Sequence, residues 1–277
     1  MLFFSLIPLF LQAAHATLEL PFVIVIPSYN NEEYCIANMD SALRQNYTNF
    51  RIIYIDDNSA DETYHRVKTH LEEEKSKVEV KLVRNEKRQG ALANFYSAIH
   101  NWVRDDEIVV QLDGDDFLMH GNVLRYLNRV YSNPKKEVWL TYGQFQEWHT
   151  KNRGWAMPMP EEIVTRNDFR KFVLVPCHLR TFYAWLFKLI RKEDLMWNGR
   201  FFSMGCDCAI MFPMIEMARD HFEFISRVLL LYNDKNPIND HKIDRALQRE
   251  VDDIIRSLPK YTPLTGSPGK FFKGVQK

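Results

Sequence analysis

Short apolar runs that end abruptly in polar or acidic residues constrain the fold of this chain more than any other feature. Three such runs are PFVIVI at 21–26, RIIYI at 51–55 and EIVVQL at 107–112, which end at Pro27, at Asp56-Asp57 and at Asp113. An unbroken apolar run of this length is typical of a strand that is buried on both faces of a sheet. These runs therefore predict the central strands of an α/β domain.

Helical patterns separate the apolar runs. After Gly90, apolar residues recur every three or four positions from Leu92 to Val103, which predicts a helix with one apolar face. Further helices are expected at 61–75, 120–132, 207–219 and 240–257, and further strands at 78–83, 137–142 and 222–232. Pro213 is expected to kink the helix at 207–219 or to mark its true start. Strands that alternate with helices predict a mostly parallel sheet with crossover helices.

The charge and cysteine content exclude several classes of protein. The 277 residues contain 36 Lys+Arg and 36 Asp+Glu, so the zero net charge argues against a nucleic-acid partner. Four cysteines are too few for a disulfide framework, although one disulfide remains possible in an exported protein. Cys206 and Cys208 lack the spacing of a zinc site, so buried thiols are the favoured interpretation.

Residues 1–16 form a hydrophobic N-terminal segment. An apolar run at 2–11 precedes Ala14-His15-Ala16, which predicts a secretory signal peptide cleaved after Ala16. The segment has no Lys or Arg, so an uncleaved membrane anchor or a misassigned start remains an alternative. We therefore expect export or a secretory-pathway lumen, or otherwise attachment to a membrane from the cytoplasm.

Aspartates follow two of the predicted strands. Asp56 and Asp57 end one strand, and Asp113, Asp115 and Asp116 follow another. Ligands of open parallel sheets bind at the carboxyl ends of the strands, so these carboxylates are expected to converge. They would repel one another unless a cation lies between them. Oxygen ligands of this kind favour Mg²⁺ or Mn²⁺ and leave positions for substrate phosphates.

Four ordered motifs resemble those of family 2 glycosyltransferases with the GT-A fold. They are IPSYNNEEY at 26–34, IDDNSADET at 55–63, RNEKRQGALANFYSAI at 84–99 and LDGDDF at 112–117. The resemblance implies an α/β, Rossmann-like, mostly parallel sheet with helices on its flanks and a C-terminal extension on the acceptor side. It also implies a nucleotide-diphosphate sugar as donor, a divalent metal as cofactor and an inverting reaction.

The resemblance also assigns nucleotide-binding and metal-binding residues. Pro27, Tyr29, Glu32, Asp56, Asp57, Arg84, Gly90 and Asp113 match nucleotide-contacting positions of the family. Asp113 and Asp115 match the metal-binding D-x-D motif, in which Asp115 is the expected direct ligand and Asp116 a supporting or capping residue. Gly90 is equally well explained as a glycine required by a turn.

The second half of the chain is expected to supply the catalytic base and the acceptor site. Asp207 matches the family's carboxylate at the start of a helix, where it takes a proton from the acceptor hydroxyl. A helix-capping aspartate is the alternative. His241 and Lys235 lie where the family places a residue beside the diphosphate. Trp148 and Trp155, in a polar segment, are candidates for the acceptor surface.

The sequence thus predicts four regions: the hydrophobic segment 1–16, a nucleotide-sugar-binding half at 17–142, an acceptor and catalytic-base half of the same domain at 143–258, and a flexible tail at 259–277. The expected function is metal-dependent transfer of a sugar, with a UDP-sugar favoured, to a glycan, lipid or protein acceptor. Two alternatives remain. A sugar nucleotidyltransferase has a similar sheet but needs a glycine-rich loop that PSYNNEE lacks. A non-catalytic nucleotide-sugar-binding protein would not require every acidic position to be filled.

Overall fold

A computed structural model describes residues 18–173, 176–238 and 240–267. The predicted signal peptide and residues 268–277 lie outside this range. The strands are β1 (Phe22–Ser28), β2 (Phe50–Asp56), β3 (Glu79–Arg84), β4 (Ile108–Gln111), β5 (Phe117–Leu118), β6 (Leu140–Glu147), β7 (Arg180–Tyr183), β8 (Met196–Trp197), β9 (Arg200–Phe201) and β10 (Phe222–Tyr232). The longer helices are α1 (Cys35–Leu43), α2 (Thr63–Glu73), α3 (Ala91–Trp102), α4 (Val123–Tyr131), α7 (Cys206–Ala218) and α9 (Arg245–Ser257). Shorter helices are α5 (Glu161–Arg166), α6 (Ala184–Lys188) and α8 (Asp240–Ile243).

An eight-stranded sheet forms the core, in the order β3-β2-β1-β4-β7-β6-β10-β5. The first four strands are parallel, as the apolar runs predict, and every residue of β1 is buried. Strand β7 is antiparallel to both of its neighbours, β4 and β6, and β5 is antiparallel to β10. The mostly parallel α/β sheet is therefore confirmed, whereas the two antiparallel insertions are absent from the sequence-based prediction.

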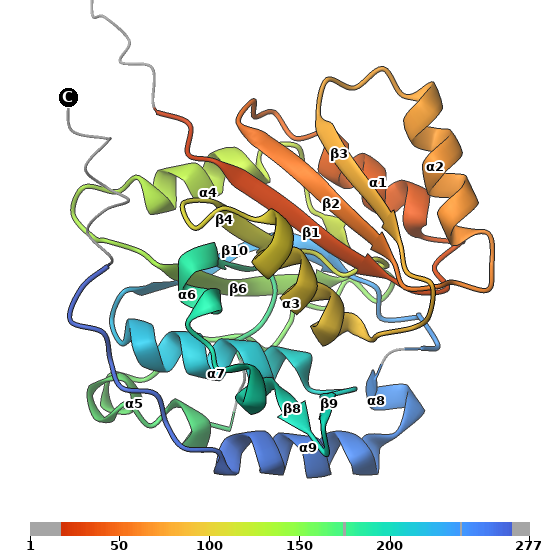
Figure 1. Ribbon diagram of the computed structural model, residues 1–277. Coiled ribbons are helices and arrows are strands. Elements are labelled where there is room, and N and C mark those ends of the chain that lie inside the picture. The colour runs from red at the N-terminus through yellow and green to blue at the C-terminus, as the bar shows by residue number, and fades with distance from the viewer. Residues whose placement is uncertain (1–17, 174–175, 239, 268–277) are drawn as a thin grey trace, which may run out of the picture.

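Helices cover both faces of the sheet (Figure 1). Helices α3 and α6 lie over the face toward the viewer, and α4 lies behind the sheet. Helix α7 packs beneath α6, and α9 packs against α7 at the outer edge. Helices α6, α7 and α9 thus form a further layer beside the parallel half of the sheet. Strand β6 runs across residue 142, the expected boundary between the two halves of the domain. Among the described residues, we find no helix with the length and apolar character that spanning a membrane requires.

Helix α7 contains a proline, Pro213, which its buried position allows it to accommodate. Its residues from Cys208 to Ala218 are buried, so tertiary packing rather than a solvent-exposed hydrogen-bond ladder stabilises it. Pro213 lies inside the helix, which neither starts nor ends at this residue. The alternative that Pro213 marks the helix start is therefore wrong, and the helix begins beside Asp207 instead.

The first residues of the segment at 259–277, for which we expect a flexible tail, contact the rest of the domain. The hydroxyl of Tyr261 donates to Oδ2 of Asp194 at 2.6 Å, and its amide donates to Oε2 of Glu216 at 3.0 Å. The amide of Leu264 donates to the carbonyl oxygen of Met217 at 2.9 Å. These hydrogen bonds hold the first residues of the segment against α7 and against Asp194.

Candidate active site

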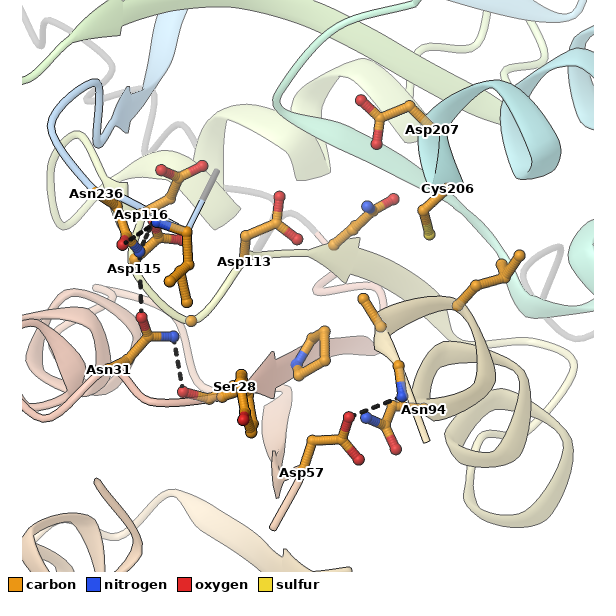
Figure 2. A pocket seen from close by; sticks show the side chains of 18 of the residues that line it. Ser28, Asn31, Asp57, Asn94, Asp113, Asp115, Asp116, Cys206, Asp207 and Asn236 are labelled. Carbon is orange, nitrogen blue, oxygen red and sulfur yellow. Dashed lines mark hydrogen bonds between the residues drawn. The ribbon is translucent and has the colours of Figure 1, made fainter. Parts of the chain in front are cut away.

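A cleft of about 290 Å³ opens at the carboxyl ends of β1, β2 and β4, between the parallel half of the sheet and α7. Figure 2 shows Asp113 near its middle, Asp57 on one side and Asp207 on the other. Five aspartates line the cleft, together with one arginine, Arg88. The five are Asp57, Asp113, Asp115, Asp116 and Asp207. The sequence-based expectation that acidic strand ends converge is therefore met.

The turn after β4 is held tightly in place. Nδ2 of Asn38 donates to the carbonyl oxygens of Asp113 and Asp116, at 2.9 and 2.7 Å. A Cβ atom on Gly114 would lie 2.6 Å from Cβ of Ser28, closer than two carbon atoms can approach. A glycine is thus required between the two aspartates of the D-G-D sequence, because β1 ends directly against the turn.

The carboxylates of this turn face different partners. Oδ2 of Asp115 accepts a hydrogen bond of 2.6 Å from Nδ2 of Asn236, which also contacts Asn31 (Figure 2). Oδ1 of Asp116 accepts from the amide of Asn233 at 2.8 Å. Burial raises the pKa of Asp115, and burial followed by repulsion from the other two aspartates raises that of Asp116 well above its usual value.

A group of three side chains could hold a metal ion. One ligand atom from each of Asp113, Asp116 and His178 lies within 4.8 Å of the other two. Asp116 is 1% exposed, and its Oδ2 has no hydrogen-bond partner among the described residues. Burial and the neighbouring Arg180 lower the pKa of His178 well below its usual value, so its ring is neutral and able to ligate. These donors fit a divalent cation. The resemblance implied Asp113 and Asp115 as metal ligands. The group contains Asp113, but its other two members are Asp116 and His178 rather than Asp115.

Asp57 organises the loop at 85–90, on the side of the cleft opposite Asp207 (Figure 2). Its carboxylate accepts hydrogen bonds of 2.8 Å from the amides of Gln89 and Gly90 and of 2.7 Å from Nδ2 of Asn85. Gly90 has a φ of 93°, which favours glycine, so the turn interpretation of this residue is supported alongside its position on the cleft. Asp57 therefore fixes the path of residues 85–90 at the cleft.

Asp56 and Arg84 lie away from the cleft. Asp56 is completely buried and its Oδ2 lies 3.4 Å from Nε of Arg84. The Arg84 guanidinium also lies 4.9 Å from the ring centroid of Tyr64. Asp56 is the last residue of β2, whereas Asp57 lies just beyond the strand and lines the cleft. We find the pair in a structural role between β2 and β3.

Arg88, which the sequence analysis did not select, is the cation at the cleft. Its guanidinium carbon lies 3.9 Å from the ring centroid of Tyr29, which lines the cleft with Pro27 as expected. Glu32 is exposed, does not line the cleft, and accepts from the amide of Glu62 at 3.1 Å. Arg88 and Tyr29 thus pack together in the lining of the cleft.

Asp207 lies in the first turn of α7, where the helix dipole favours a negative charge. Its side chain is 41% exposed, lines the cleft, and forms an ion pair with Arg180. The N-cap of the helix is Gly205, so the alternative role of Asp207 as the capping residue is not the one observed. Arg180 and His178 come from the segment that enters β7, and neither has a sequence signal that would have identified it.

Three of the remaining candidates, Lys235, Trp148 and Trp155, do not line the cleft. Lys235 is exposed, and the side chain of His241 lies outside the described residues. Trp148 packs edge-on against Phe117, with ring centroids 4.7 Å apart, whereas Trp155 is 52% exposed. The structure therefore leaves Trp155 as the more accessible of the two tryptophans. The thiols of Cys35, Cys177 and Cys208 are buried.

The order of these elements can be compared with known families. The family model for glycosyl transferase family 2 matches residues 23–196, more than half of the chain. This chain belongs to glycosyltransferase family 2. The matched range contains β1 to β7, and so includes the acidic turn, the Asp57 loop, His178 and Arg180, but it ends before Asp207.

Two curated proteins of the family resemble the chain at 28% identity. One is the UDP-Glc:alpha-D-GlcNAc-diphosphoundecaprenol beta-1,3-glucosyltransferase WfgD of Escherichia coli, over 62% of this chain and 65% of that protein. The other is an uncharacterized glycosyltransferase of Haemophilus influenzae, over 44% of this chain and 46% of that protein. The chain thus matches less than two thirds of the length of either relative.

Solved structures of glycosyltransferases share the fold. S. aureus TarS 1–349 in complex with UDP-GlcNAc has a TM-score of 0.58 at 16% identity, covering 85% of this chain and 65% of that one. Glucosyl-3-phosphoglycerate synthase from Mycobacterium tuberculosis was solved in complex with Mn²⁺, UDP and glucosyl-3-phosphoglycerate. It has a TM-score of 0.57 at 13% identity, covering 87% of this chain and 81% of that one. The GT-A fold expected from the four motifs is therefore confirmed.

Proposed function

We propose that the chain transfers a sugar from a nucleotide-diphosphate sugar to a hydroxyl acceptor, with inversion at the anomeric carbon. The observation that carries the proposal is the line of acidic groups across one cleft, from the Asp57 loop through the acidic turn to Asp207. One end suits a nucleotide, the middle suits a cation with a diphosphate, and the other end offers the partly exposed carboxylate of Asp207. A binding protein would have no use for the third group.

The cation would be Mn²⁺ or Mg²⁺, held by Asp113 with Asp116 and His178, and with Asp115 close by. When bound, it supplies positive charge that offsets the charge growing on the leaving diphosphate. The chain itself fixes the ligands, since Asn38 holds the turn and Asn236 orients Asp115. The orphaned oxygen of Asp116 and the neutral ring of His178 support this assignment.

Asp207 is the proposed catalytic base. It would take the proton of the acceptor hydroxyl as the oxygen attacks the anomeric carbon, and no covalent enzyme intermediate would form. Its partly exposed carboxylate at the cleft supports this role. The acceptor would enter beside α7, where Phe202, Ser203 and Gln248 line the cleft.

A UDP-sugar is the favoured donor. WfgD is named as acting on UDP-Glc, and TarS was solved with UDP-GlcNAc, which supports the choice without deciding the sugar. The acceptor class is a glycan, lipid or protein that presents a hydroxyl group. WfgD is named for a diphosphoundecaprenol-linked GlcNAc, so a lipid-linked sugar is one candidate. Residues 1–16 would place the enzyme in an exported compartment or at a membrane.

Release of nucleoside diphosphate tests the proposal. The full chain is incubated with a panel of nucleotide sugars and candidate hydroxyl acceptors, with Mn²⁺ or with EDTA. We expect metal-dependent release from one donor, and loss of that release in Asp207→Asn. Pyrophosphate release from a nucleoside triphosphate and a sugar phosphate would instead identify a nucleotidyltransferase. Donor binding without transfer or hydrolysis across the acceptor panel would favour a binding protein.

A further inference from the structure

Arg180 is a buried cation that reaches the cleft only through another residue. Its side chain is 1% exposed and does not line the cleft, yet it forms an ion pair with Oδ2 of Asp207. Its Nε donates to the carbonyl oxygen of Pro176 at 3.1 Å. Its two terminal nitrogens each lie 3.2 Å from one ring nitrogen of His178. The guanidinium is thus held on three sides by its own chain segment and by α7.

A second buried arginine, which pairs with another carboxylate of α7, shows what a purely structural pair looks like. Arg170 is 4% exposed at its side chain, and its partner Glu216 is completely buried. Nε and Nη2 of Arg170 donate to the two carboxylate oxygens at 2.7 and 3.0 Å. This bidentate pair uses both oxygens of the carboxylate and faces no cleft. Arg180, in contrast, holds one oxygen of a carboxylate that remains 41% exposed.

We infer that Arg180 is a positioning residue that aims the Asp207 carboxylate at the acceptor hydroxyl. This inference rests on the proposed transfer reaction. The ion pair restrains Oδ2 and leaves Oδ1 for the acceptor proton. A guanidinium keeps its charge at every pH at which an enzyme works, and its fork shape fixes direction as well as distance. Burial opposes the charge on Arg180, but Asp207 and Asp113 raise its pKa.

The sheet links this carboxylate to the acidic turn. Arg180 stands opposite Gln111 in the antiparallel register of β7 with β4, and β4 leads directly into Asp113. One strand pair therefore carries both the turn that is proposed to hold the cation and the arginine that holds Asp207. Reorientation of Asp207 should slow the chemical step without weakening the donor complex, provided that the cation site is filled. Because Arg180 also contacts the His178 ring, the variants are compared at saturating Mn²⁺.

The test compares matched substitutions of the two buried arginines. Arg180→Lys and Arg180→Ala are measured beside Arg170→Lys, each for kcat, donor KM, UDP affinity in the presence of Mn²⁺, and Tm. We expect kcat of the Arg180 variants to fall about 10²-fold, the loss that a small misplacement of a catalytic group causes, with donor KM and UDP affinity unchanged. Arg170→Lys should lower Tm and leave kcat near the wild-type value.

Rescue separates positioning from folding. Millimolar guanidinium, below denaturing concentrations, should restore part of the kcat of Arg180→Ala and none of the activity lost in Asp207→Asn. If Arg180→Ala does not fold, Arg180→Lys decides the matter, since it keeps the charge and loses the fork. Wild-type kcat in Arg180→Lys, or a fall in UDP affinity that matches the fall in kcat, would overturn the inference.

The proposed function can fail independently of this inference. Absence of metal-dependent transfer by the wild-type chain would remove the reaction itself. Wild-type transfer that survives Asp207→Asn would remove the base, and Arg180 would then have no carboxylate to aim. If Asp207→Asn keeps a measurable but reduced rate, the double variant Asp207→Asn/Arg180→Lys should be no slower than Asp207→Asn alone, because both changes act through one group. An additional loss would contradict the positioning role.

Discussion

Nδ1 of His178 lies 4.0 Å from Oδ2 of Asp113, although Asp113 follows β4 and His178 precedes β7, two strands of opposite direction. The imidazole is buried and neutral, and the orphaned oxygen of Asp116 lies in the same group. A histidine is thus brought to an acidic turn that would otherwise offer oxygen ligands alone. The pairing has direct consequences for metal binding.

His178→Asn should weaken Mn²⁺ binding about tenfold, because one neutral nitrogen ligand is lost. Mn²⁺ affinity can be measured by electron paramagnetic resonance without any substrate. His221→Asn is the control, since His221 stacks on Trp139 away from the cleft and has no ligand role here. Equal Mn²⁺ affinity in the two variants would exclude His178 from the metal site.

Asp207→Asn should lower kcat by about 10²-fold or more while UDP affinity stays unchanged, because the amide cannot accept the acceptor's proton. Asp115→Ala should lower turnover by a similar factor, because it weakens binding of the cation and the diphosphate instead. Isothermal titration with UDP and Mn²⁺ separates the two effects. Near-normal turnover in Asp207→Asn would remove that residue from the role of base.

Gly114→Ala should disrupt the acidic turn. The added methyl group would lie 2.6 Å from the side chain of Ser28, so either the turn or β1 must shift. Such overpacking costs about 1–3 kcal/mol of unfolding free energy. Thermal unfolding and Mn²⁺ titration should both show the loss. Gly266→Ala meets no atom within 4 Å and should behave as the wild type; equal effects of the two substitutions would contradict this account.

Asp57→Asn should weaken UDP binding by loosening the loop at 85–90. The carboxylate accepts three hydrogen bonds, and an asparagine would place an NH₂ group against at least one of the donors. Loss of one bond to a charged group costs about 1.5–3 kcal/mol, or roughly 10- to 100-fold in affinity. Asp56→Asn should instead lower Tm, because Asp56 pairs with Arg84 away from the cleft. UDP affinity that is insensitive to Asp57→Asn would refute this role.

Asp116→Asn should stabilise the metal-free protein. Burial and the neighbouring carboxylates raise the folded-state pKa of Asp116, so the folded state binds a proton that the unfolded state has already lost. Stability in EDTA therefore falls as pH rises from the unfolded pKa, about 3.9, through the raised folded pKa. The substitution removes this dependence and should raise Tm at neutral pH by about 2–4 °C per kcal/mol relieved. In saturating Mn²⁺ the wild type should instead have the higher Tm of the two proteins. A Tm in EDTA that Asp116→Asn leaves unchanged would contradict the prediction.

The sequence by itself determined the parallel half of the molecule and the acidic groups on it. Its apolar runs are buried on both faces and end where the sheet ends, so local pattern and tertiary position coincide for Asp57, Asp113 and Asp115. Asp207 could be found because its motif precedes an apolar helix. The four ordered motifs also identified the family, which the family model confirms.

Only the tertiary structure decided which of these groups meet. Strand β7 enters the sheet in the antiparallel direction between β4 and β6, and this places His178 and Arg180 beside the end of β4. No local pattern encodes that neighbour, because strand order depends on contacts between residues far apart in sequence. The end of β2 likewise leaves Asp56 in the interior beside Arg84, whereas Asp57, just beyond the strand, lines the cleft. The sequence identified which residues could form the site, whereas the partner of each residue depended on the order and direction of the strands in the sheet.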